Sequence, residues 1–195
     1  MGRLEEAHLH NTSEPTEFSD AVEAFVTFWR SLRQAELVPQ AARFLDCADP
    51  RFQPFVSFND VDPDGDVIVT LVGTALADMM HADWTGLSTS AFLPPAVARG
   101  YREELTMCAG HPCGMWELTN FTTSQSRAIK VEVISLPLKL GSGRRFRVAR
   151  FHRLVEVMHR SETMSGEMRW RSKAWVDIGG GLPSRDPLPS AMPGP

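Results

Sequence analysis

The amino-acid sequence predicts an α+β domain in which one five-stranded antiparallel sheet carries short helices on one face. Three observations lead to this prediction. An apolar stripe of helical period lies near the start, two apolar runs flank a turn signal around residue 63, and strand-like segments return after residue 114. Strands divided by a helical block are typical of α+β domains. A chain of 195 residues is long enough for one such domain with appendages.

The N-terminal part is predicted to be an arm followed by an amphipathic helix. Residues 1–15 are polar and aperiodic, so we expect a flexible arm. Over 16–37 apolar residues recur at three- and four-residue steps, which indicates a helix that Thr16 or Ser19 can cap. The apolar stripe must be buried against this domain or a partner copy, and we expect the interface of a homodimer. It consists of Phe18, Val22, Phe25, Trp29 and Leu32.

The strands and helices of the domain follow over residues 38–157. Runs at 55–61 and 67–73 have strand composition, and Asp62-Pro63-Asp64-Gly65 between them is a strong turn. A short helix then begins at its cap, Thr74, and a longer one opens at Pro94-Pro95 and stops at Gly110. Three further strands are expected over 115–123, over 129–138 and from Phe146 onward. Residues 158–195 end in a Gly/Pro-rich segment, and we expect this extension to be largely disordered.

The composition limits the class of protein. Net charge is −4, which argues against nucleic-acid binding, and the three cysteines indicate free thiols in a reducing compartment. The start lacks a secretory signal and the longest uncharged stretch is interrupted by prolines, so we expect a cytoplasmic protein without a membrane partner. Charge is uneven along the chain: residues 1–120 carry 7 basic against 18 acidic residues, and residues 121–195 carry 13 against 6. The two parts could pair within one fold or between subunits, or remain solvated faces.

Several short motifs together resemble those of one family. They are Phe28-Trp29-Arg30-Ser31-Leu32-Arg33, Leu71-Val72-Gly73-Thr74, Asp83-Trp84-Thr85-Gly86, and Pro137-Leu138 at a strand end. In this order and spacing, the sequence resembles a bacterial branch of stand-alone PAS-like proteins over residues 20–157. The resemblance implies a five-stranded antiparallel sheet, with a small-molecule or protein-interaction pocket between the sheet and the short helices. Some residues of these motifs also have a structural interpretation. Gly73 suits a sharp turn of the backbone, and Asp83, Thr85 and Gly86 are residue types that favour turns.

A sensory or regulatory module that binds a small apolar or amphipathic ligand is therefore the expected function. A ligand-free dimerisation or docking scaffold is the alternative. The pocket is expected between the helices of 75–108 and the inner face of the sheet, in a region rich in methionine, whose side chain adapts to ligands. The residues expected nearest to it are Met80, His81, Trp84, Tyr101, Trp116 and Phe121.

Other chemistries receive less support from the residues. Cys108, His111 and Cys113 supply one ligand fewer than a structural zinc site needs, so we expect no metal. His81 or His152 could be an axial haem ligand, but no Cys-x-x-Cys-His motif is present and haem is disfavoured. No hydrolase or nucleotide-binding motif is found, and no enzymatic activity is expected.

An arginine-rich strand could form a separate interaction surface. Its arginines fall mostly at odd positions until Arg150 breaks the pattern. An acidic protein partner and a solvated sheet edge are both consistent with this strand, which contains Arg144, Arg145, Arg147, Arg150 and Arg153.

Overall fold

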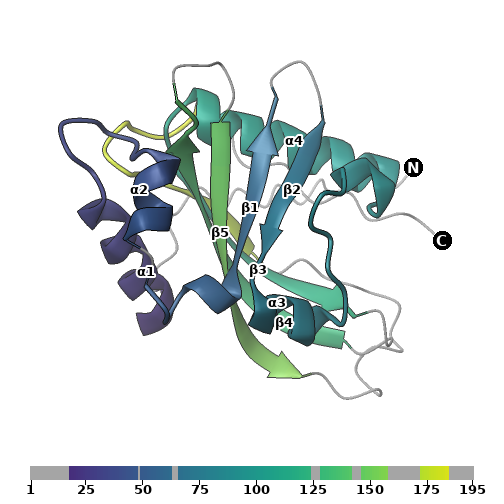
Figure 1. Cartoon of the computed structure of the whole chain (residues 1–195). Helices are drawn as coiled ribbons and strands as arrows, with labels where there is room; N and C mark the ends of the chain where they lie inside the picture. Colours follow the sequence, from purple (N-terminus) through teal and green to yellow (C-terminus); the bar gives the residue numbers. More distant parts are fainter. Residues whose placement is uncertain are drawn as a thin grey trace, which may run out of the picture.

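Up to β5, the helices and strands follow the predicted order: helices, two strands, a block of short helices with one longer helix, and then further strands (Figure 1). The computed structural model describes residues 18–47, 49–62, 66–123, 128–141, 146–157 and 172–184. The α-helices and 3-10 helices are α1 (Asp20–Ser31), α2 (Ala41–Asp46), η1 (Gln53–Phe55), α3 (Thr74–Met80), η2 (Thr89–Ala91) and α4 (Pro95–Gly110). The strands are β1 (Val56–Val61), β2 (Val67–Val72), β3 (Gly114–Thr122), β4 (Ala128–Lys139), β5 (Phe146–Val157) and β6 (Ser172–Val176).

The strands form one antiparallel sheet in the order β2-β1-β5-β4-β3-β6. The α+β class is thereby confirmed, and β1–β5 are the five strands expected. A sixth strand corrects the prediction, because β6 lies in the extension that was expected to be largely disordered. It pairs with the edge of β3 and its segment buries Trp175, Val176 and Ile178. Two large apolar side chains and one valine thus offset the entropic cost of ordering this segment.

Helices cover both faces of the sheet, not one face as expected. Alternate residues of β4 show this, since successive side chains of a strand point to opposite faces. Ile134, Leu136 and Leu138 belong to the cluster that contains the α1 side chains, whereas Ile129, Val131 and Val133 pack with Leu76 and Met80 of α3. In Figure 1, α1 and α2 lie together on one side of β5, and α3 lies on its other side. The site described below lies on the α3–α4 face.

The apolar stripe of α1 is buried within the chain's own core. Val22, Phe25 and Trp29 are fully buried, and Leu32 is nearly so. Phe25 stacks on Phe151 of β5 at 4.9 Å between ring centroids. This corrects the expectation that the stripe is a dimer interface: the domain itself covers it, including the partly buried Phe18. The cap is Ser19, whose hydroxyl accepts a hydrogen bond from the amide of Val22.

Gly73 occupies the turn between β2 and α3. A Cβ atom at this position would lie 2.4 Å from the carbonyl oxygens of Gln53 and Pro54, so only glycine allows η1 to pack here. Gly73 is also the N-cap of α3, and Thr74 is the first helical residue, with no side-chain cap hydrogen bond. The expected Thr74 cap was therefore wrong. Among the described residues, none of the helices has the length and apolar character needed to cross a membrane.

Candidate ligand-binding site

A cavity of about 350 Å³ lies between the sheet and the cover formed by α3, η2 and α4. Its walls are largely apolar and come from β2, α3, the connection from α3 to α4, α4 itself and β3. These wall residues are Val69, Leu76, Met80, Ala82, Trp84, Thr89, Phe92, Leu93, Val97 and Phe121. The floor is polar and comes from the sheet and from Tyr101 of α4. The floor residues are Ser57, Asn59, Tyr101, Glu117, Arg150 and His152.

The floor is a hydrogen-bonded network centred on Arg150. Its guanidinium group lies 3.1 Å from the Glu117 carboxylate, and it donates to the Tyr101 hydroxyl at 2.8 Å and to the Ser135 hydroxyl at 3.0 Å. Tyr101 in turn donates to the side-chain oxygen of Asn59 at 3.0 Å. Arg150 and Glu117 are both buried, so each provides the countercharge that makes the other's burial tolerable. Burial acts to lower the pKa of Arg150, but Tyr101 and Glu117 outweigh it and raise that pKa.

His152 is held neutral beside this network. Desolvation, reinforced by the positive charge of Arg150, lowers the pKa of His152 to about 3. Its Nδ1 lies 3.4 Å from the carbonyl oxygen of Phe55, which can only accept a hydrogen bond. The Arg150–Glu117 pair is consequently the only charged pair that lines the cavity among the residues described.

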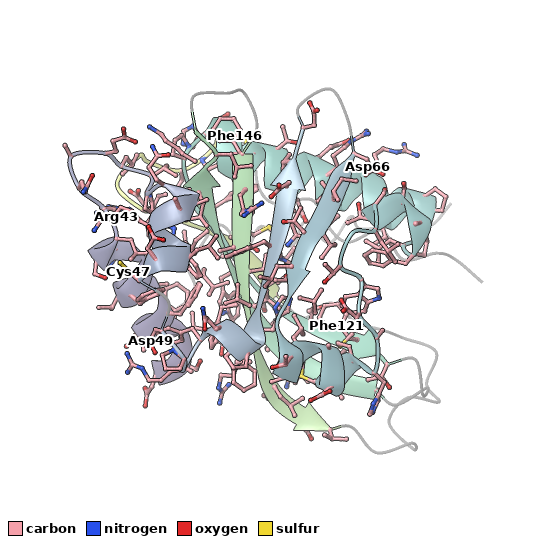
Figure 2. The ribbon with its side chains drawn as sticks, in the orientation of Figure 1. Arg43, Cys47, Asp49, Asp66, Phe121 and Phe146 are labelled. Carbon is pink, nitrogen blue, oxygen red and sulfur yellow. The ribbon has the colours of Figure 1, made fainter. Side chains whose placement is uncertain are left out.

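The connection from α3 to α4 is fastened to the edge of β2. The backbone amide of Val69 donates to the carbonyl oxygen of Leu87 at 2.9 Å. The amide of Gly86 donates to the carbonyl oxygen of Val69 at 2.7 Å. Asp66 accepts hydrogen bonds from the hydroxyls of Ser88, Ser90 and Thr89. Desolvation acts to raise the pKa of Asp66, but these bonds outweigh it and lower the pKa to about 2. Figure 2 labels Asp66 at the start of β2 and Phe121 near the cover.

Two aromatic rings form part of this cover. Trp84 and Phe92 are stacked, with ring centroids 5.4 Å apart and planes inclined by 12°. Both side chains are half-buried. Asp83 and Thr85 form the expected turn beside them, since the amide of Thr85 donates to the Asp83 carboxylate at 2.9 Å.

Four of the six predicted pocket residues line the cavity, namely Met80, Trp84, Tyr101 and Phe121. The other two do not. His81 is exposed at the end of α3, where it adopts a left-handed backbone conformation. Trp116 points to the opposite face of the sheet, where its indole donates to Glu132 at 2.9 Å.

The polar floor was missed by reasoning from the sequence. A signal was available: Ser57 and Asn59 are polar residues two apart on β1, and Arg150 and His152 are two apart on β5. Since residues two apart share one face of a strand, these pairs mark a polar inner surface. Arg150, which breaks the arginine pattern, is the member of that series that points inward.

The arginine-rich strand is paired within the chain. Arg147 contacts Asp60 at 2.6 Å and Arg153 contacts Glu132 at 3.3 Å, in addition to the Arg150–Glu117 pair. Arg144 and Arg145 lie outside the described residues. A further ion pair joins Lys173 to Glu104 at 2.8 Å. Like the pairs of Arg147 and Arg150, it links the basic residues after position 120 to acidic residues before it. The uneven charge is thus compensated inside one fold at these positions.

Cys108 and Cys113 are buried at the junction of α4 and β3. A hydrogen bond between the Cys108 and Cys113 side chains, together with desolvation, raises the pKa of the Cys108 thiol. Within the described ranges, no cluster of three or more His, Cys, Asp or Glu side chains is arranged to hold a metal ion. The two thiols are packed against Met115 and Trp175, which makes them part of a small apolar cluster.

Comparisons with known proteins add little to this geometry. No protein-family model matches the chain, and no curated protein does. Among solved structures, it is similar to the crystal structure of the PAS domain of an HTR-like protein from Haloarcula marismortui. The TM-score is 0.39 and the sequence identity 17%, with 51% of this chain and 81% of that chain covered. A likeness this distant supports no argument, so the proposals below depend on the cavity.

Proposed function

We propose that this chain is a non-enzymatic, PAS-like sensory or regulatory module that binds a small amphipathic molecule in the cavity. The observation that carries the proposal is the cavity itself, with apolar walls and a hydrogen-bonding floor under a helical cover. Concave, mostly apolar sites with a few polar groups are the usual form of small-molecule sites. The charged groups of the floor are engaged with one another, which suits binding better than catalysis.

Binding would be reported through the cover. The connection that carries Trp84 and Phe92 is attached to β2 by a few hydrogen bonds, whereas α4 and the sheet are anchored by buried side chains. A ligand against the walls would therefore change the position or the stability of this connection first. A partner that contacts the cover would sense that change.

A cavity-filling variant tests the proposal. Val69 is 4% exposed and lines the cavity, while its neighbour on β2, Ile68, is 37% exposed and does not. We expect Val69→Phe to abolish the rise in melting temperature that a bound compound causes, because the phenylalanine ring would fill the space that the compound occupies in the cavity. Ile68→Phe is the matched control and should retain it. Native mass spectrometry before and after denaturation identifies compounds that co-purify; equal responses of both variants would contradict the proposal.

A second candidate function is a dimerisation scaffold, and the end of β5 favours it. β5 extends beyond the last residue paired with β1, Phe151, and its final residues Leu154, Val155 and Val157 are 39–45% exposed. Arg153 and Glu156 lie on the same face of the sheet, although they are three positions apart, because the pairing with β4 shifts between them. They pair with Glu132 and Lys130, which are two positions apart on β4. Two copies pairing antiparallel along this edge would set Arg153 of each opposite Glu156 of the other.

Charge placed in this edge should separate the two candidates. We expect Val155→Lys to convert a dimer to a monomer in sedimentation equilibrium, because like charges would meet near the two-fold axis. Leu87→Lys, at a comparably exposed position on the cover, is the control. A wild-type chain that is monomeric at high concentration would exclude this scaffold function.

A further inference from the structure

The charge of the cavity floor indicates which class of ligand the site selects. This inference rests on the proposed function. Only Glu117 and Arg150 carry charge among the cavity-lining residues described, and they neutralise each other at 3.1 Å. His152 adds no charge at neutral pH because burial and Arg150 suppress its protonation.

The charged groups packed around the floor are also paired. Glu104 of α4, three residues after Tyr101, accepts hydrogen bonds through both carboxylate oxygens from Lys173 of β6, each at 2.8 Å. Asp66, at the edge of the cover, accepts several hydroxyl hydrogen bonds. An ionic ligand would thus lose its hydration and find no unpaired countercharge among the cavity-lining residues that the structure describes, a loss that proteins rarely compensate.

Neutral hydrogen-bonding groups remain suitable partners. Asn59 has a second amide hydrogen beyond the one that points to Ser57, and hydroxyl groups can act as donor and acceptor. The apolar walls and the Trp84–Phe92 pair offer flat aromatic surfaces. The best complement is a molecule with a planar apolar body and one uncharged polar end.

We propose that the cavity selects uncharged, planar amphipathic molecules over anions and cations, and that Glu117 is the residue that sets this selectivity by neutralising Arg150. A hydroxyl, carbonyl or carboxamide end would exchange hydrogen bonds with the floor. Without Glu117, Arg150 would present a buried positive charge with no carboxylate beside it, and the same cavity would prefer a carboxylate end.

The test compares three ligands of nearly equal shape: benzamide, benzoate and benzylamine. Their binding to the full chain is measured by ligand-observed NMR titration at pH 7.5. We expect the wild type to bind benzamide roughly ten-fold or more tightly than either ion. In Glu117→Gln we expect the order of benzamide and benzoate to reverse, because a buried guanidinium seeks an anion.

The control is Glu132→Gln, which removes the partner of another arginine, Arg153, on the opposite face of the sheet. It should leave the ligand order unchanged. If the wild type binds benzoate or benzylamine as well as benzamide, the selectivity is overturned while the binding function stands. If Glu117→Gln folds and keeps the wild-type order, the role of Glu117 is overturned. If none of the three binds the wild type, both this inference and the proposed function fail. The wild-type comparison remains decisive even where Glu117→Gln does not fold.

Discussion

At the scale of single residues, two glycines provide opposite tests of the backbone. Gly73 meets the carbonyls of Gln53 and Pro54, whereas Gly100, inside α4, has no heavy atom within 4 Å of an added Cβ. We expect Gly73→Ala to lower the free energy of unfolding by about 1–3 kcal/mol or more, since neighbouring backbone must shift. Gly100→Ala should raise it by about 0.5–1 kcal/mol, because alanine favours helix. Urea unfolding measures both, and equal effects would contradict the described contact.

Two buried titratable groups predict opposing pH dependences. The pKa of His152 is lowered to about 3 by desolvation and by Arg150, so its contribution to stability is present above pH 6.5 and is lost as pH falls below that value. The pKa of Glu104 is raised to about 7: desolvation raises it more than Lys173 lowers it, and Glu117 adds to the rise. A carboxyl with a raised pKa contributes most below its unfolded pKa of 4.5, and this contribution is lost as pH rises toward 7.

The two effects should partly cancel between pH 4.5 and 6.5, and single variants should separate them. Glu104→Gln leaves His152 acting alone, so its stability should fall more steeply on acidification than that of the wild type. His152→Asn leaves Glu104 acting alone, so its stability should fall as pH rises from 4.5 to 7. Urea midpoints across this range report the slopes. Parallel curves for all three proteins would show that neither group is coupled to folding as described.

At the scale of elements, α1 is a core helix, and its energetics should show this. Phe25 is fully buried and contacts the rings of Phe44, Phe52 and Phe151. We expect Phe25→Ala to destabilise the chain by about 3–5 kcal/mol, by an amount that does not depend on protein concentration. An interface side chain would instead give a melting temperature that varies with concentration. Thermal unfolding over a hundred-fold range of concentration distinguishes the two.

The elements also show how far the sequence could predict the structure. The helical stripe of α1, the β1–β2 hairpin and the span of α4 follow from local periodicity and turn residues, which is why these predictions agree with the structure. β6 could not be found in this way, because its five residues form a strand only against the edge of β3. The surface that covers α1 could not be predicted either. An amphipathic period indicates that one face of a helix is buried, but it does not indicate which other element buries it.

The site shows the same division between local and long-range information. Met80, Trp84, Tyr101 and Phe121 were predicted because an aromatic and methionine-rich segment beside short helices favours a pocket. The floor depends on which face of each strand points inward and on pairing between Glu117 and Arg150, which are 33 positions apart in the sequence. A single charged residue in a strand gives no indication of its partner, so the selectivity of the cavity emerges only from the assembled sheet.

For the molecule as a whole, the arrangement of α1 constrains the time at which the chain can fold. The helix is made of residues 20–31. Phe44 and Phe52, soon after it in the sequence, cover part of it, but its core cluster also includes side chains from β1, β4 and β5, and Val176 and Ile178. Trp29 donates to the carbonyl of Pro137, and Arg33 donates to that of Ile178. During synthesis, the aromatic face of α1 would therefore remain partly exposed until β6 has left the ribosome and can pack with the rest of the core. We expect nascent chains arrested before residue 172 to be protease-sensitive and to associate with chaperones, while chains released at full length become resistant.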